Sequence, residues 1–535
     1  MPVVELEYRH LSQLTRVKNT KKLYEILPYL GLDIEGGDER LVRVEYSPNR
    51  PDYSTIYGIA AGLRYILGKS KPLAKFKIKS AKHKEHIHVD AKVAKIRPYI
   101  VGIIARGRKL DNFEIKSLMS MQEDLHSGLC RKRKKSSIGV HNLDSIQFPI
   151  RYCTVDRSHR FAPLGHDVEM SVKEILERTE TGTLYSKLLK GDTHVPILMD
   201  SEDKTVSLPP VINAASTALK NGIDGIFVEV TGMGKRDVED ALSVVAHTLS
   251  EMGFTIQEVG ISGVGNSTAK LLPATQKLSS KLVSKTIGLE MTLTQIRASL
   301  AKSGIYSKIS NGNLSCSIPR HRFDIFSPMD LVEETMLGYG VQNLEPKLSP
   351  HSFVGSASTV AKGIHVLGET MIGLGCTETK NSALVDGASN KNLRVSKTGF
   401  SNTVLRSSLL DGLLGTFSHN VHEAYPQRLF EIGTVFGTKS PVTEEIRLCT
   451  VISHGGANYT EAKSLLQAIL TEFGLKANTV AAKHPLMNEG QSAVVQVDGK
   501  KIGIVGTIDG RVQSNRKIRE SISAFEITVS GLIFD

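Results

Sequence analysis

The stretch RHRFDIFSPMDLVEE, residues 320–334, joins a helix start to a concentration of acidic residues. Ser327 can cap a helix, Pro328 suits the first helical position, and an acid three residues after the serine completes a capping box. Three of the acids share one face of this helix, and a fourth precedes the cap and can fold back toward that face. The four acids are Asp324, Asp330, Glu333 and Glu334.

Two interpretations of this acidic cluster stay open. Converging carboxylates repel one another unless a cation neutralises them, and a hard, oxygen-binding ion such as Mg²⁺ fits that role. Alternatively, the acids favour the helix start and form salt bridges with Arg320 and Arg322. The residues alone do not decide between a metal site and a structural role.

The residues before the cluster predict a helix followed by a hairpin. Residues 292–303 repeat apolar side chains at helical spacing. Asn311 and Gly312 then stand between two alternating stretches within 306–318, which is the strongest two-residue hairpin signal. A helix followed by such a hairpin predicts a winged-helix-like shape, and that shape alone does not establish nucleic-acid binding.

Residues 347–535, after the cluster, predict a larger α/β unit. One helix face is expected from four apolar residues, Leu405, Leu409, Leu413 and Phe417. RLFEIGTVF (428–436) predicts a strand, and residues 493–508 predict a hairpin that turns at Asp498 and Gly499.

The N-terminal part contains SPNRPD, residues 47–52. Its two prolines hold the backbone extended, and Asp52 or Ser54 can cap the helix predicted next. Two basic runs follow, at 69–86 and 130–135. We expect a solvated linker and a solvated loop there, with contact to an RNA backbone as the alternative.

The segment IFVEV, residues 226–230, predicts a strand. Its alternation places Phe227, Glu229 and Thr231 on one face, which either lines a polar-tipped pocket or faces solvent. Three histidines of the same region have no mutual spacing that indicates catalysis, and we expect surface or packing roles for them. They are His126, His141 and His194.

The composition is that of an ordinary globular protein. The chain has 535 residues, of which 40% are hydrophobic and 23% are charged, so three or four domains are expected. The net charge of +12 permits a polyanionic partner but does not prove one. No apolar run reaches the roughly 20 residues of a membrane helix, and no signal peptide is recognisable. The 5 cysteines form no C-x-x-C pair, which predicts a reducing cytoplasm. No Walker loop, H-E-x-x-H or nucleophile motif stands out.

Four motifs in this order resemble the β subunit of phenylalanyl-tRNA synthetase in its archaeal and eukaryotic form. The resemblance covers the whole chain and rests on these stretches: SPNRPDYSTIYGIAAGLRYILG (47–68); IGVHNLDSI (138–146) with SLPPVINAA (207–215) and GIFVEVTG (225–232); PRHRFDIFSPMDLVEETMLGYG (319–340); and VLRSSLLDGLLGTFSHN (404–420) with RLFEIGTVF (428–436).

The resemblance implies a multidomain α+β fold. The expected parts are an N-terminal domain (1–85), an editing domain (86–265), a winged-helix-like domain with the metal-binding acids (266–346) and an inactive antiparallel-sheet domain shaped like a class II synthetase core (347–535). The last part lacks the glycine-rich, arginine-ended motif that holds ATP. Arg406 could be mistaken for an ATP-binding arginine, but the sequence predicts it within a helix.

The same resemblance implies a function. The family forms a cytoplasmic (αβ)₂ heterotetramer with an α subunit that joins phenylalanine to tRNA(Phe) using ATP and Mg²⁺. The Mg²⁺ ligands would be Asp324, Asp330, Glu333 and Glu334, in a site shared with α. The editing domain would hydrolyse mischarged Tyr-tRNA(Phe), with Glu229 accepting the phenol proton, Thr231 positioning it and Asn213 near the ester or ribose. A free-standing aminoacyl-tRNA editing hydrolase and a non-enzymatic RNA-binding scaffold stay open as alternatives.

Overall fold

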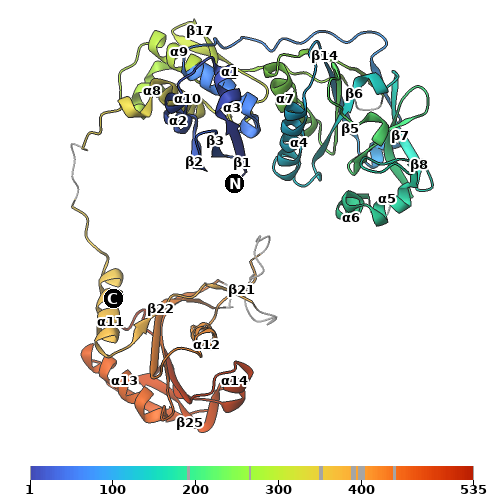
Figure 1. Ribbon diagram of the computed structural model, residues 1–535. Helices are drawn as coiled ribbons and strands as arrows, with labels where there is room; N and C mark the ends of the chain where they lie inside the picture. The colour runs from blue at the N-terminus through green and yellow to red at the C-terminus, as the bar shows by residue number, and fades with distance from the viewer. Residues whose placement is uncertain are drawn as a thin grey trace. The chain divides into compact units, whose positions relative to one another are not determined.

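The computed structural model describes residues 2–189, 193–263, 267–348, 354–386, 393–395, 404–437 and 441–533. The chain divides into two compact units, Met1–Lys347 and Leu348–Asp535, which are drawn together in Figure 1. The boundaries predicted inside the first unit, after 85 and after 265, stay predictions, and residues 264–266 lie outside the described residues. None of the described helices is long and apolar enough to cross a membrane.

The first unit begins with a small sheet, β1-β3-β2, packed with helices. Thr55 caps the helix after SPNRPD through a hydrogen bond from the Gly58 amide at 3.2 Å. The prediction that Asp52 or Ser54 caps it was wrong, because Arg50 takes up the Asp52 carboxylate. The elements are β1 (Val3–Glu7), α1 (Tyr8–Thr15), α2 (Thr20–Ile26), β2 (Leu32–Gly37), β3 (Leu41–Tyr46) and α3 (Ile56–Ile66).

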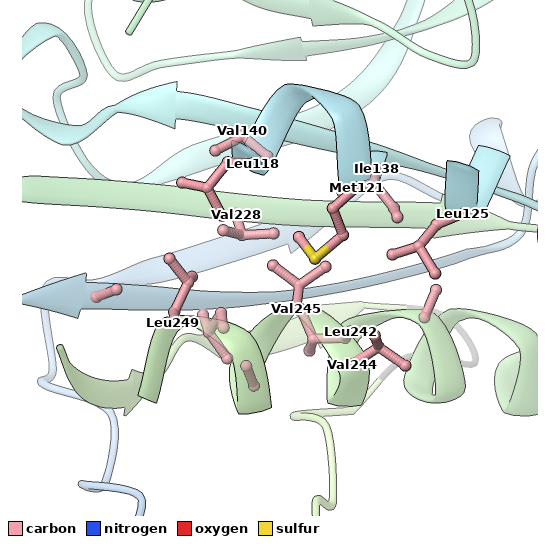
Figure 2. Packing of buried hydrophobic residues seen from close by; sticks show 14 of the residues in the cluster. Leu118, Met121, Leu125, Ile138, Val140, Val228, Leu242, Val244, Val245 and Leu249 are labelled. Atoms are coloured by element: carbon pink, nitrogen blue, oxygen red, sulfur yellow. The ribbon is translucent and has the colours of Figure 1, made fainter. Parts of the chain in front are cut away.

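The predicted strand around IFVEV is the centre of a four-stranded sheet in the order β14-β5-β13-β6. Val228 on one face lies in a buried cluster with Met121 of α4 and Val245 of α7 (Figure 2). The other face carries Glu229 and is also buried, so the solvent-face alternative was wrong. The elements are β5 (Tyr99–Arg106), α4 (Asn112–Ser127), β6 (Ser136–Asn142), β13 (Gly225–Gly232), α7 (Lys235–Glu251) and β14 (Thr255–Glu258).

A second sheet of this region has the order β12-β11-β10-β7-β4-β15. Short helices and a small two-stranded sheet accompany it. The elements are β4 (His86–Val89), β7 (Ile150–Asp156), β8 (Arg160–Phe161), β9 (Met170–Ser171), α5 (Val172–Arg178), α6 (Glu180–Tyr185), β10 (His194–Met199), β11 (Thr205–Leu208), β12 (Ile212–Asn213) and β15 (Gly260–Gly263).

The end of the first unit matches the local predictions closely. The hairpin turns at Asn311 and Gly312, whose φ angles of 49° and 72° suit a two-residue turn. Ser327 and Asp330 form the predicted capping box of α10. The elements are β16 (Ala274–Leu278), α8 (Ser280–Ile287), α9 (Leu293–Lys302), β17 (Tyr306–Ser310), β18 (Asn313–Ile318) and α10 (Pro328–Tyr339).

The second unit is built on a seven-stranded sheet, β19-β22-β23-β27-β26-β25-β24, antiparallel except where β19 joins β22. One buried cluster includes residues of α11 and α13, and another includes residues of α12. The elements are α11 (Thr359–Gly373), β19 (Thr377–Glu378), β20 (Leu384–Val385), β21 (Val404–Leu405), α12 (Leu410–His419), β22 (Gln427–Phe436), β23 (Glu444–Ser453), α13 (Tyr459–Glu472), β24 (Ala477–Ala481), β25 (Met487–Val497), β26 (Lys500–Ile508), α14 (Gly510–Asn515) and β27 (Ile522–Thr528).

The helix predicted to include Leu405 begins later than expected. Leu405 belongs to β21, and α12 starts at Leu410. The Glu526 carboxylate on β27 accepts hydrogen bonds from the amides of Leu409 and Leu410, at 3.3 and 3.2 Å. A side chain far along the sequence therefore fixes where this helix begins.

Candidate functional site

A cavity of about 370 Å³ lies beside the buried polar face of β13. Strand β6, helix α4 and the segment from β11 to β12 also contribute to its walls. Most of the lining is apolar, and it includes Ile115, Met119, Leu164, Leu208, Val211 and Leu219. Such a cavity suits an apolar ligand that carries few polar groups.

Glu229 brings a carboxylate to this apolar cavity while being only 2% exposed. Its Oε1 accepts a hydrogen bond from Ser207 Oγ at 3.1 Å. Its Oε2 is buried and has no hydrogen-bond partner among the described residues. Leaving a buried charged oxygen unpaired costs more than leaving a neutral one, so this oxygen retains the capacity to accept a further hydrogen bond.

Gly139 makes the space that Glu229 occupies. The two residues are opposite one another in the β6–β13 register. A Cβ atom at position 139 would collide with Glu229 Oε1 and lie 2.6 Å from His141 Nε2. The absence of a side chain at this position therefore lets the carboxylate lie against the strand.

His141 extends the polar group behind Glu229. Its Nδ1 lies 2.9 Å from Thr217 Oγ1, and the Thr217 hydroxyl lies 3.1 Å from the Ala214 carbonyl oxygen that accepts from it. Because the Thr217 hydroxyl donates to Ala214, its oxygen accepts from His141 Nδ1, and the other ring nitrogen, Nε2, lies 3.9 Å from Glu229 Oε1. The packing prediction for His141 was incomplete, because the ring is both stacked on Phe227 and hydrogen-bonded.

The structure brings Asn213, but not Thr231, to the cavity wall beside Glu229. Asn213 Nδ2 donates to the Val140 carbonyl oxygen at 3.3 Å. Thr231 is fully buried and accepts from Arg97 Nε at 2.9 Å. Burial lowers the pKa of Arg97, whose guanidinium also donates to the Thr231 carbonyl oxygen at 2.8 Å. Thr231 thus belongs to a polar cluster behind the site.

The basic run at 130–135 contributes one side chain to the cavity. Arg133 is 8% exposed and donates to the Val211 carbonyl oxygen at 2.8 Å and to Glu123 Oε1 at 2.9 Å. Arg131, Lys132 and Arg133 all have left-handed φ angles of 48°, 52° and 60°. Each such residue costs roughly 1–3 kcal/mol, so the surrounding contacts must hold the turn in place.

Three of the four acids predicted to bind metal are engaged by other groups. Asp324 and Glu334 both pair with the buried guanidinium of Arg322. Asp330 Oδ2 accepts from the amides of Phe326 and Ser327, at 2.8 and 2.7 Å, and Glu333 is exposed. Arg320, the other arginine considered, pairs instead with Glu239 and Asp240 of α7.

The arrangement of these acids favours the structural interpretation of the cluster. In the described part of the chain, no group of three or more histidine, cysteine or acidic residues is placed to hold an ion. Mg²⁺ would compete with Arg322 for two of the carboxylates and with backbone amides for a third. The donor set as arranged therefore fits capping and ion pairing.

The class of protein follows from comparison with known families. Residues 276–341 match a family described as the tRNA synthetase B5 domain, and residues 346–529 match one described as the phenylalanyl tRNA synthetase beta chain CLM domain. These matches place the chain among proteins built from tRNA synthetase domains.

Similar full-length proteins define the family more narrowly. The phenylalanine–tRNA ligase beta subunit of Methanosarcina barkeri is 33% identical, with 100% of this chain and 99% of that protein covered. That of Archaeoglobus fulgidus is also 33% identical, with 99% and 98% covered. A crystal structure of an N-terminal fragment of the beta subunit from Pyrococcus horikoshii matches with a TM-score of 0.60 and 28% identity, covering 63% of this chain and 100% of the fragment. The chain belongs to the phenylalanine–tRNA ligase beta subunit family, and the predicted family is confirmed.

Proposed function

We propose that this chain is the β subunit of a cytoplasmic (αβ)₂ phenylalanine–tRNA ligase. Its α partner carries out the ATP- and Mg²⁺-dependent attachment of phenylalanine to tRNA(Phe). The cavity beside Glu229 hydrolyses mischarged Tyr-tRNA(Phe). Full-length similarity to ligase subunits supports the complex over a free-standing hydrolase or an RNA-binding scaffold, because neither would need the second unit.

The unpaired Oε2 of Glu229 is the observation that carries the hydrolytic proposal. Tyrosine differs from phenylalanine by one hydroxyl, and an apolar pocket discriminates against an added hydroxyl only about a hundredfold. A carboxylate oxygen without a partner can accept a hydrogen bond from that hydroxyl, so the cavity binds the tyrosyl group more tightly than the phenylalanyl group. We assign Asn213 to the ester or ribose end and water to the attack on the ester. Thr231 supports the site through Arg97.

The test is deacylation of Tyr-tRNA(Phe) by the reconstituted α–β complex. Glu229→Gln replaces the charged acceptor and is expected to slow hydrolysis by about tenfold to a hundredfold, the loss of one charge-assisted hydrogen bond. Glu180→Gln is the matched control, because Glu180 also lines the cavity but is exposed. Equal hydrolysis by Glu229→Gln and the wild type would refute the assignment.

We propose that Mg²⁺ reaches Asp324, Asp330, Glu333 and Glu334 only in the complex, where α contributes to the site. Arg322 would then have to release Asp324 and Glu334. We derive no reaction step from this ion.

We further propose that the winged-helix-like part is the helix α9 with its following hairpin, and that the second unit has a synthetase-core shape without an aminoacylation site. Arg406 supports this view, although its predicted place within a helix was wrong. It precedes α12, is buried, and pairs with Glu431 of β22, so its guanidinium is engaged inside the unit.

A further inference from the structure

Residues Arg131–Lys134, which we call the basic turn, present three cations to solvent. Arg131, Lys132 and Lys134 are exposed, whereas Arg133 between them is buried in the cavity wall. No ion-pair partner is found for the three exposed side chains within the described residues. Three exposed positive charges therefore lie within two sequence positions of Arg133, which lines the cavity.

The backbone of the basic turn is firmly held. Lys134 N donates to the Arg131 carbonyl oxygen at 3.2 Å, and Lys135 N donates to that of Cys130 at 3.1 Å. Arg133 adds its bonds to the 210–211 carbonyls and lies over the Tyr185 ring at 4.4 Å. The three consecutive left-handed residues are therefore fixed by contacts on the buried side, and the exposed side chains start from a defined backbone.

A solvated loop after a helix does not require three consecutive left-handed residues that carry positive charge. A cation near the C-terminus of α4 would satisfy the helix dipole without three left-handed residues in succession. The cavity rim also carries the exposed acid Glu180, which repels a phosphate backbone, whereas the exposed acid Glu123 is already paired with Arg133. A polyanion that delivers its end to this cavity needs compensating positive charge beside it, and the basic turn provides that charge.

We propose that the basic turn binds backbone phosphates of the 3′ acceptor strand of an aminoacyl-tRNA whose ester enters the cavity. This inference rests on the proposed hydrolytic function. Phosphate contacts position a nucleic acid without reading its bases, which suits a surface that serves one end of the molecule. Arg133 connects the phosphate-binding surface to the cavity, because it lies within the basic turn and is hydrogen-bonded to the cavity wall.

The test uses the α–β complex carrying R131E/K132E/K134E. We expect the KM for deacylation of Tyr-tRNA(Phe) to rise about tenfold or more, with kcat within about twofold of the wild type. The dependence of KM on salt should weaken as well, because fewer counterions are released on binding. R16E/K21E/K22E is the matched control, since it reverses three exposed cations and Arg16 also has a left-handed φ of 56°. A KM unchanged from wild type, or raised equally by the control, overturns the proposal.

Two further measurements separate failure of the basic turn from failure of hydrolysis or folding. R131G/K132G removes charge while glycine accepts the left-handed backbone, so it should raise KM without lowering the melting temperature. Binding of tRNA(Phe) carrying tyrosine through a stable 3′ amide tests the surface without catalysis. If the wild type binds this RNA but does not deacylate the ester, the hydrolytic function fails. Weaker binding by R131E/K132E/K134E then still supports the basic turn, and unchanged binding overturns it.

Discussion

The Glu229 carboxylate depends on an atom that is missing opposite it. Gly139 has no Cβ, and any side chain there would push into Glu229 and His141. The β6–β13 pairing that creates this space joins segments far apart in the sequence. A single methyl group is therefore enough to displace the acceptor from the cavity wall.

Gly139→Ala is expected to abolish most Tyr-tRNA(Phe) hydrolysis and to lower the free energy of unfolding by about 1–3 kcal/mol, the usual cost of overpacking. Deacylation rates and denaturant unfolding check both effects. Gly415→Ala is the control, because a Cβ at Gly415 in α12 meets no atom within 4 Å apart from the backbone of its own helix. Normal hydrolysis by Gly139→Ala would show that Glu229 need not occupy its present position.

At the scale of elements, His126 links helix α4 to strand β6. Its Nε2 accepts the Ile138 amide hydrogen at 2.9 Å, while Nδ1 lies 3.2 Å from Glu123 Oε1. Burial lowers the pKa of His126 from its ordinary value of 6.5, so the folded chain favours the neutral ring that this bond requires. The link between helix and strand is therefore sensitive to acid.

The sign of the pH effect follows directly. Below pH 6.5 the unfolded chain takes up a proton at His126 more readily than the folded chain does, so stability falls as pH falls through that value. We expect the Ile138 amide to lose hydrogen-exchange protection between pH 7.5 and 5.5, beyond the intrinsic change of exchange rate. In His126→Gln this pH dependence should disappear. A protection factor that is constant with pH in the wild type would contradict the expectation.

Local signals account for most elements that the sequence predicted. The turns at Asn311-Gly312 and Asp498-Gly499 lie where expected, because their residues favour left-handed φ angles by themselves. The predicted start of α12 was wrong, because a hydrogen bond to Glu526 on β27 determines where this helix begins. Likewise, Glu229 was predicted from its own strand, whereas His141, Ser207 and Arg133 enter the site through pairings and turns that the sequence does not reveal. The only signal for His141 was the pairing of Gly139 with Glu229. That pairing becomes visible only when the register of β6 and β13 is known.

At the scale of the whole molecule, we expect the isolated chain neither to bind Mg²⁺ nor to catalyse pyrophosphate exchange, because both need the α partner. Arg322 and backbone amides already occupy three of the four acids, so isothermal titration should detect no stoichiometric Mg²⁺ binding. Phenylalanine-dependent pyrophosphate exchange should also be absent, since no adenylate forms.

Adding the α subunit should restore the exchange. Tight Mg²⁺ binding by the isolated chain, lost in the variant D324N/E334Q, would contradict the first expectation. Exchange without α would contradict the second. The two outcomes are independent, because the acids belong to the first unit and the seven-stranded sheet belongs to the second.

The pairing of Arg322 with Asp324 and Glu334 also affects the stability of the chain before it binds its partner. Two carboxylates that would otherwise repel each other carry their own counter-charge from the moment the first unit folds. These two carboxylates therefore need no divalent ion to balance their charge. Chelators should accordingly leave the melting temperature of the unassembled subunit unchanged.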